Sequence, residues 1–513
     1  MKVGLLYSKV QTDDRRLRWS LWALFVGSAA LGLYFLIEPI GGELYYKVGH
    51  DRTAHQFSRE VLPLFIPWGL ALMAWRQGLR VPLKLLFGAA LVLHLIVLLA
   101  PPAMSQDFYQ YLFYGRIQVE HGGNPYLHLP SEFWLDRWFA WTRWHDQTSV
   151  YGPLWMLITA GVARMAGDSL TLAFMQLKMV ILALDVTVMA LIVYGAKLLR
   201  PARGEDGDGL FRSNGGSDWE GAAGFGLLAF AWNPLVLVSI PLSGAVDVVL
   251  AAAFVGALVA RRIRRPGLAT VLLALAALVK VYAVAALGLH LLLLARERNW
   301  RTAIRHGAAS AAIAAVAYAP YWAGWRTFNG LIQAFGYTNH SLVGAVQDVL
   351  ISFLRLVNVH PAAPVAEMVM RIVITPVLIG VAIWAVRRVR DEDTLWKSVL
   401  VVLSAYLFLT PWFMYWYIVG VLALVAALPR NRLTDPILVF SGTSVIATWW
   451  FPFIEEVPAT LQRVLQAALR YVPPVLVFRR QQRRTVPPAE PVPSARSEYH
   501  QPVGAGESRG TGG

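Results

Sequence analysis

Apolar residues run through this chain in long stretches that short polar segments separate. Stretches such as Leu85–Ala100, Val248–Ala260 and Val271–Ala295 contain almost no charged residues. About 20 apolar residues are enough to cross a bilayer as a helix, so the pattern predicts an all-α polytopic membrane protein with about 12–14 transmembrane helices. No stretch alternates apolar and polar positions in the way that a transmembrane barrel requires.

Composition agrees with this pattern. Of the 513 residues, 57% are hydrophobic and 15% are charged, whereas soluble proteins carry about 25% charged residues. The net charge of +15 comes from short basic clusters between apolar runs, which is typical of cytoplasmic loops and argues against a nucleic-acid partner. The absence of cysteine excludes disulfides and thiolate chemistry. The basic N-terminus leads into Trp19–Ile40 without a small-residue cleavage site, which favours a retained first span.

Placing the basic clusters in the cytoplasm predicts the topology. The predicted spans are 18–40, 61–76, 82–101, 171–198, 222–241, 244–260, a hairpin at 267–295, 307–323, 364–387, 396–411, 412–428, 436–452 and 461–478. Both termini then lie inside, and 102–170 forms one large outer loop. Residues 1–484 make up the transmembrane domain, while the Pro/Ser/Gly-rich residues 485–513 are expected to be a disordered cytoplasmic tail.

Two segments do not fit simple spans. Residues 153–166 are too short to cross and are expected to form a re-entrant or interfacial helix. The segment 267–295 has basic clusters on both sides, so it must enter and return. Two arms of about 14 residues reach about 21 Å, less than the roughly 30 Å of a bilayer core. Lys280 and Tyr282 would lie at the tip, and polar groups at that depth imply a cavity that opens outward.

The outer loop begins with a pattern of mixed chemistry. Asp107, Tyr111, Tyr114 and Gln118 fall at i, i+4, i+7 and i+11, which predicts one stripe of an amphipathic helix on the membrane surface. The Gly-Gly-Asn-Pro segment 122–125 would end that helix. Two interpretations stay open: Asp107 caps a helix that only covers the bundle, or it has a chemical role.

Other ionisable residues divide into structural and functional candidates. His145 and Asp146 are two adjacent potential metal ligands, a weak signal that fits a solvated loop better. Within the apolar segments, Asp247 and Lys280 are functional candidates because charge is costly there. Lys280 has no adjacent acid, so an anionic ligand is its expected partner.

Two further pairs have structural interpretations. Lys178 and Asp185 lie two turns apart and would form either a buried pair or a catalytic one, whereas Glu367 and Arg371, at i and i+4, are expected to pair with each other.

Several motifs, in this order, carry a family resemblance. They are Asp107-x3-Tyr111-x3-Gly115-Arg116-x7-Asn124-Pro125-Tyr126, Tyr151-Gly152-Pro153-Leu154-Trp155, Asn233-Pro234-Leu235-Val236-Leu237, Leu278-Val279-Lys280-Val281-Tyr282, Pro411-Trp412 and Trp416. The pattern resembles polyprenol-phosphate-mannose-dependent mannosyltransferases of the GT-C superfamily. The resemblance implies a multi-pass plasma-membrane glycosyltransferase with its active site on the extracytoplasmic face.

The resemblance also implies roles for particular residues. Asp107 would be the catalytic base, and Arg116 and Lys280 would stabilise the departing polyprenyl phosphate. The other substrate-binding residues would be Tyr111, Asn124, Tyr126, Asp247 and Tyr282. The chain departs from its relatives where Gln106 and Phe108 replace a second acid, and where 243–247 lacks a His and an Asn. No cofactor is specified, and a divalent metal stays open.

The sequence therefore predicts an enzyme that moves a hexose, mannose in the first instance, from a polyprenyl-phosphate donor to a glycan or glycolipid acceptor in the cell envelope. Two other functions compete with it. A lipid or glycan flippase also needs intramembrane charge, but it would show repeated halves, which the sequence lacks. An undecaprenyl-diphosphate glycan ligase would favour paired arginines and a histidine in an outer loop.

Overall fold

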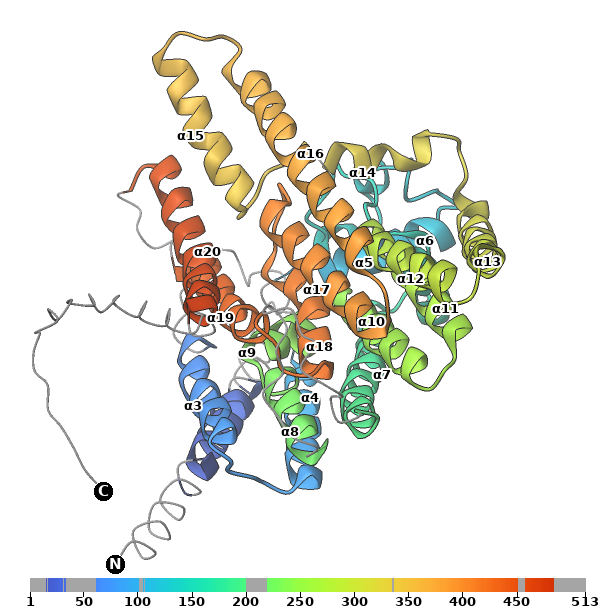
Figure 1. The fold of residues 1–513 in the computed structure, drawn as a ribbon. Coiled ribbons are helices and arrows are strands. Elements are labelled where there is room, and N and C mark those ends of the chain that lie inside the picture. Colours follow the sequence, from blue (N-terminus) through green and yellow to red (C-terminus); the bar gives the residue numbers. More distant parts are fainter. Residues whose placement is uncertain are drawn as a thin grey trace, which may run out of the picture.

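The computed structural model describes residues 15–33 except 16 and 31, together with 61–100, 105, 107–199, 219–334, 336–450 and 457–483. Within these ranges the regular structure is helical (Figure 1), and β-pairing is limited to two isolated bridges, Ala323 with Trp325 and Asn339 with Trp412. The all-α prediction is confirmed. The predicted tail at 485–513 and the end of the first span at 34–40 lie outside the described residues.

The α-helices labelled in Figure 1 have the following bounds. They are α3 (Phe65–Arg76), α4 (Leu83–Leu99), α5 (Asp107–Val119), α6 (Pro153–Ala166), α7 (Leu170–Lys197), α8 (Trp219–Ala229), α9 (Pro234–Leu237), α10 (Asp247–Arg262), α11 (Pro266–Ala277), α12 (Val284–Glu297), α13 (Trp300–Tyr318), α14 (Asn329–Ala334), α15 (Leu342–Leu356), α16 (Ala362–Arg388), α17 (Glu392–Leu409), α18 (Ile418–Ala427), α19 (Thr434–Trp450) and α20 (Ala459–Arg483).

Few of these helices can cross a bilayer alone. By length and composition α7 and α16 are sufficient, and a third span results if α8 and the segment Pro234–Leu242, bent by 55°, are counted together. Several other apolar helices have only 10–17 residues. Helices lie close to the predicted spans in the described part of the chain, but the number of about 12–14 full crossings is not confirmed. Breaks such as the π-helical turn at Pro241 shorten them.

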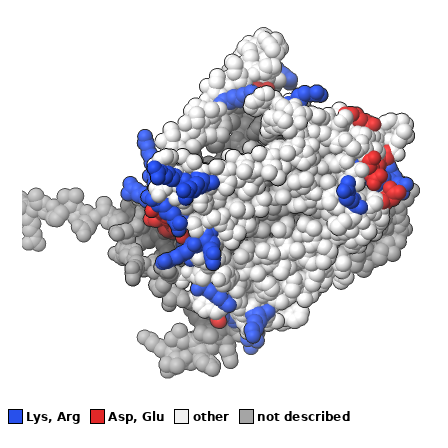
Figure 2. Space-filling view, turned by 90° about the vertical axis from the view of Figure 1, so that its right-hand side faces the viewer, with Lys and Arg blue, Asp and Glu red and all other residues white. Residues whose placement is uncertain are grey.

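The surface has the character of a membrane protein. Figure 2 shows a broad face without charged side chains, bordered by Lys and Arg on one side and by a group that includes Asp and Glu on the other. Large apolar side chains such as Ile372 and Val373 of α16 are more than half exposed. Lipid solvates such side chains without cost, whereas water does not. The chain is therefore a membrane protein.

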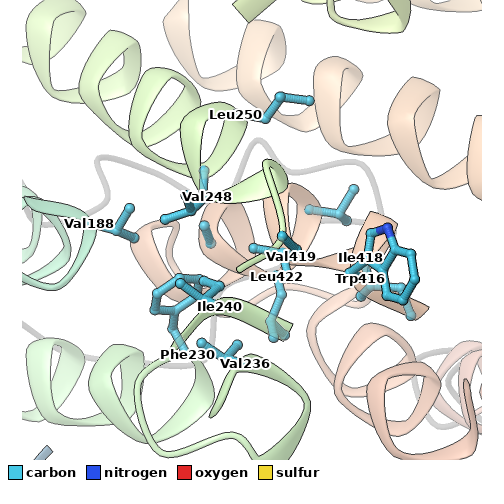
Figure 3. Close-up of a cluster of buried hydrophobic side chains, with 14 of the residues drawn as sticks. Val188, Phe230, Val236, Ile240, Val248, Leu250, Trp416, Ile418, Val419 and Leu422 are labelled. Carbon is cyan, nitrogen blue, oxygen red and sulfur yellow. The ribbon is translucent and has the colours of Figure 1, made fainter. Parts of the chain in front are cut away.

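The core lies between α7, α8, α10 and α18. Figure 3 shows side chains of these helices converging, among them Val188, Val248 and Leu422, together with Phe230 of the turn after α8, all fully buried. The break between α8 and α9 is closed by Asn233, whose side chain accepts a hydrogen bond from the Leu235 amide at 2.9 Å.

The turn that precedes α10 lies against Phe108 of α5. Gly244 has φ of +69°, and a Cβ there would lie 2.2 Å from the Phe108 ring, so only glycine allows this approach.

The predicted surface helix exists as α5, but its predicted exposed face does not. Residues 108–117 are all buried, because α6 packs against one side of the helix. A Cβ at Gly115 would lie 2.2 Å from the Thr159 carbonyl oxygen, so the two helices touch through their backbones. Residues 153–166 form α6 as a helix of 14 residues; its re-entrant character stays a prediction.

Of the two interpretations left open for Lys178 and Asp185, the buried pair is wrong. Asp185 contacts His94, with Nδ1 and Oδ2 2.5 Å apart. Lys178 instead donates to backbone carbonyls, including that of Leu242 at 2.9 Å. Both sets of contacts follow from burial. The carbonyl groups at the break after α9 lack helical partners and need a donor, which Lys178 supplies, and the buried Asp185 carboxylate needs a partner, which is His94.

The predicted pair of Glu367 and Arg371 is confirmed at 2.5 Å.

Candidate active site

One cavity of about 250 Å³ opens between the outer loop and the hairpin. This volume lies near the lower end of the roughly 300–1,000 Å³ that is typical of small-molecule sites. The lining residues come from α5, the loop before α6, the turn between α11 and α12, α14 and the segment around α17 and α18. They are Asp107, Gln110, Tyr114, Trp144, Gln147, Thr148, Val150, Tyr151, Lys280, Val281, Tyr282, Leu331, Ala334, Tyr337, Tyr406, Thr410, Pro411, Trp412, Met414, Trp416 and Tyr417.

Asp107 is the only carboxylate among these lining residues. It lies at the first turn of α5, and both of its oxygens accept hydrogen bonds. The Trp144 indole N–H donates to Oδ1 at 3.0 Å, and the Tyr151 hydroxyl donates to Oδ2 at 3.4 Å. Burial raises the pKa of the Asp107 carboxyl, and the hydrogen bond from Trp144 and the charge of Lys280 oppose that rise. A carboxylate of raised pKa is a stronger base than an ordinary one.

The loop that carries Trp144 is fixed to α5. The side chain of Gln110 accepts a hydrogen bond from the Trp144 amide at 3.1 Å, and the Tyr114 hydroxyl donates to the Gln147 carbonyl at 2.8 Å. Gln110 and Tyr114 follow Asp107 by three and seven residues, so all three lie on neighbouring faces of α5. Helix α5 therefore carries Asp107 and also positions the Trp144 indole that donates to it.

The hairpin tip is held against the Tyr-Gly-Pro segment. The amide of Gly152 donates to the Val279 carbonyl at 2.9 Å, and that of Leu154 donates to the Leu278 carbonyl at 3.1 Å. A Cβ at Gly152 would lie 2.1 Å from the Leu278 carbonyl oxygen. The two sequence motifs thus form one junction, and it brings Tyr151 and Lys280 to the same cavity.

Lys280 has a partner that the sequence did not indicate. Its Nζ lies 2.8 Å from both carboxylate oxygens of Asp247, and it also lies 4.0 Å from the centroid of the Tyr417 ring. Lys280 therefore has an acid partner within the chain, which was not expected from the sequence, and its binding of an anionic ligand stays a prediction. Asp247 is the first residue of α10 and precedes Lys280 by 33 residues along the chain. Its side chain is completely buried behind the lysine. Tyr282 lines the cavity beside this pair and stacks on Tyr406 at 4.6 Å.

Tyr111, Asn124 and Tyr126 do not line the cavity. Tyr111 lies edge-on to Tyr151, with ring centroids 4.9 Å apart. The Tyr126 hydroxyl donates to the Tyr151 carbonyl at 2.8 Å. Asn124 donates to the Tyr321 carbonyl at 2.9 Å and accepts from the Tyr126 amide at 3.0 Å. Tyr111 and Tyr126 thus support the segment that carries Tyr151, and Asn124 positions Tyr126.

Arg116 is also absent from the cavity lining. Its guanidinium donates to Asp136 at 2.7 and 2.9 Å and to Asp168 at 2.9 Å, and it lies over the Trp138 ring. Arg116 follows Asp107 by nine residues, which is about 13 Å along a helix. The structure thus places Arg116 in an ion-pair network of the outer loop, away from the predicted phosphate.

Several lining residues escaped the sequence prediction of the site. Tyr151, Trp412 and Trp416 occur in the motifs that carry the family resemblance, so a signal existed for them. Tyr337 and Tyr406 lie in segments without any such motif, and only the packing of distant helices brings them to the cavity.

The residues around the cavity do not fit a metal ion. Within the described ranges no group of three or more His, Asp and Glu side chains has a suitable arrangement. The two nearby acids are already engaged, Asp247 by Lys280 and Asp107 by Trp144 and Tyr151. The His145 side chain donates to the Thr142 carbonyl of its own loop, and Asp146 accepts from Ser131.

Two family models match the chain. One, described as alpha-(1->6)-mannopyranosyltransferase, N-terminal domain, matches residues 25–209, and the other, glycosyltransferase family 87, matches residues 169–411. The first range contains Asp107 and the second contains Asp247 and Lys280. No curated protein sequence matches the chain significantly.

Proposed function

We propose that this chain, which is a membrane glycosyltransferase of the GT-C type, transfers a hexose from a polyprenyl-phosphate donor to a hydroxyl group of a glycan acceptor on the outer face of the plasma membrane. The resemblance predicted from the motifs is confirmed at the level of the family. The observation that carries the finer proposal is the cavity itself, in which one carboxylate, Asp107, and one ammonium, Lys280, face the same space.

The proposed reaction is an inverting displacement. The acceptor hydroxyl attacks the anomeric carbon of the donor sugar, and Asp107 takes the proton of that hydroxyl. The bond between the anomeric carbon and the phosphate oxygen breaks, and its electron pair leaves with the polyprenyl phosphate. A β-linked donor then gives an α-linked product. Asp107 supports this role because it lies at the cavity and burial raises the pKa of its carboxyl.

Lys280 supports the choice of a phosphate as the leaving group. An ammonium group acts as a point charge for phosphate, and here it is held at the wall of the cavity by Asp247. Charge that develops on the departing oxygen would strengthen its contact with Lys280 in the transition state. The hydroxyl groups of Tyr282, Tyr406 and Tyr417 offer further hydrogen-bond donors on the same side.

The sugar and the linkage rest on the family match. A model described as an alpha-(1->6)-mannopyranosyltransferase matches the part of the chain that contains Asp107, so we propose mannose as the transferred sugar. An outer-face location follows from the clusters of Lys and Arg, which favour the cytoplasmic side. The ligase alternative is less well supported because neither arginine nor histidine lines the cavity within the described residues.

The experiment is a donor panel. The purified protein in nanodiscs is incubated with polyprenyl-phosphate mannose, polyprenyl-phosphate glucose and a nucleotide-linked mannose, each with a synthetic α-mannoside as acceptor. The proposal predicts release of polyprenyl phosphate and an α-linked product from the mannosyl donor. Use of the nucleotide sugar alone would refute the donor class, and release of polyprenyl phosphate from the glucosyl donor alone would refute the sugar.

A further inference from the structure

We propose that an aromatic cluster of Trp144, Trp412 and Tyr337 forms the acceptor subsite of this enzyme and binds a pyranose ring of the acceptor glycan. The inference rests on the proposed function, since it assigns particular residues of the same cavity to binding of the acceptor. Trp144 and Trp412 meet edge to face with ring centroids 6.0 Å apart, and Trp412 and Tyr337 meet at 6.2 Å. All three line the cavity.

The cavity lining contains two chemically different groups of side chains. In one group the ammonium of Lys280 lies over Tyr417, and Tyr282 stacks on Tyr406. The aromatic cluster is the other group. Asp107 connects the two, because it accepts a hydrogen bond from the Trp144 indole at 3.0 Å and also experiences the charge of Lys280.

These contacts of Asp107 allow each group of lining residues to be assigned to one substrate. In an inverting displacement the nucleophile approaches from the side opposite the leaving group, and the base must lie within hydrogen-bond reach of the attacking hydroxyl. A phosphate at Lys280 therefore places the acceptor hydroxyl beside Asp107 on the side of Trp144. The acceptor group that carries this hydroxyl must then rest on the aromatic cluster.

The chemistry of the cluster fits a sugar ring. Tryptophan and tyrosine combine a broad apolar face with one polar group, which suits a pyranose, whose C–H faces are apolar and whose edges carry hydroxyls. The Gln147 side chain donates to the Tyr337 hydroxyl at 3.1 Å, so two polar groups stand beside the rings. A polar hydroxyl-binding edge next to an apolar wall is typical of a small-molecule site.

The cluster is also built to face the cavity. The segments that carry Tyr337 and Trp412 are tied by backbone hydrogen bonds, from the Asn339 amide to the Pro411 carbonyl at 3.1 Å and from the Phe413 amide to the Asn339 carbonyl at 2.9 Å. Tyr337 remains 44% exposed, so these rings are not simply core residues. Their position differs from that of Trp134, in the same outer loop as Trp144, which is 65% exposed and is not among the residues that line this cavity.

The test compares acceptors and variants in steady-state transfer from polyprenyl-phosphate mannose. Octyl α-mannoside presents a sugar ring, whereas 1-octanol presents a hydroxyl with the same tail and no ring. The inference predicts that the wild-type protein uses octyl α-mannoside and not 1-octanol. Replacing Trp412→Leu should raise the KM for octyl α-mannoside about tenfold, which corresponds to about 1.4 kcal/mol, while the KM for the donor stays within twofold.

Trp412→Phe keeps an aromatic face and should retain most of the acceptor affinity. Comparison of Trp412→Phe with Trp412→Leu therefore distinguishes the loss of stacking from a folding defect. Trp134→Leu serves as the matched control in the outer loop and should leave the KM for octyl α-mannoside unchanged. An unchanged acceptor KM in Trp412→Leu would overturn the inference while the proposed function stands. Equal use of 1-octanol would overturn the inference and the glycan acceptor of the proposed function, while the donor reaction stands. Failure of the wild-type protein to consume any polyprenyl-phosphate sugar would instead refute the proposed function.

Discussion

The ion pair of Lys280 and Asp247 makes a prediction that separates folding from donor binding. Both oxygens of Asp247 lie 2.8 Å from Nζ of Lys280, and the two side chains are 0% and 11% exposed. Replacing Lys280→Met therefore leaves a buried carboxylate without its partner, which costs about 3–5 kcal/mol of the free energy of unfolding. Replacing Asp247→Leu should cost less, because the freed ammonium can reach water in the cavity.

The double variant Lys280→Met/Asp247→Leu removes both charges. A buried ion pair replaced by apolar residues is often neutral or stabilising, so the double variant should recover most of the stability lost in Lys280→Met. Donor affinity should not recover, because the cation that binds the phosphate is gone. The free energy of unfolding is measured by denaturant titration in mixed micelles, and donor binding by the KM for polyprenyl-phosphate mannose.

An exposed pair provides the control. Glu367 and Arg371 are 40% and 67% exposed, so Arg371→Met should change the free energy of unfolding by only about 0–1 kcal/mol. The reasoning on the buried pair is refuted if the double variant is as unstable as Lys280→Met. The phosphate role of Lys280 is refuted if the double variant binds the donor as well as the wild type does.

Three further predictions concern the base and the segments that support it. The base must be ionised, and burial raises the pKa of Asp107, so kcat/KM should fall on acidification at a pH above the ordinary aspartate value of about 3.9. Trp144→Phe removes a hydrogen bond that stabilises the carboxylate, so the acidic limb should move to higher pH; a shift to lower pH would contradict the assignment. A methyl group in Gly152→Ala would meet the Leu278 carbonyl at 2.1 Å and should lower kcat/KM at least about tenfold. In the control Gly161→Ala the methyl group meets nothing within 4 Å and should leave kcat/KM unchanged. Equal activities of the two variants would argue against the junction between the Tyr-Gly-Pro segment and the hairpin tip.

The fold class and three residues of the cavity could be predicted from sequence patterns. Long apolar runs indicate segments that are buried in lipid or in the protein core, and in this chain those segments are helices, so the helices were predicted well. Asp107 and Lys280 were predicted because charge next to an apolar run is costly unless it is used, and Tyr282 was predicted from its place beside Lys280 at the hairpin tip. All three line one cavity.

Properties that depend on the packing of distant segments were not accessible from the sequence. Asp247 pairs with Lys280 from 33 residues away, and Tyr337 and Trp412 meet only through the contact of two loops. The mixed pattern of α5 predicted two faces, yet α6 and the outer loop cover both of them. Arg116 shares a motif with Asp107, but helix rise carries it out of reach of the cavity.

The most direct test of the central claim is the rate of mannosyl transfer by Asp107→Asn. The amide keeps the size of the side chain and can still accept from Trp144, but it cannot take a proton, so transfer from polyprenyl-phosphate mannose should fall at least about 100-fold while the KM for the donor changes little. Asp146→Asn, an isosteric change in the same outer loop away from the cavity, should retain the wild-type rate. Wild-type transfer by Asp107→Asn would contradict the assignment of Asp107 as the catalytic base.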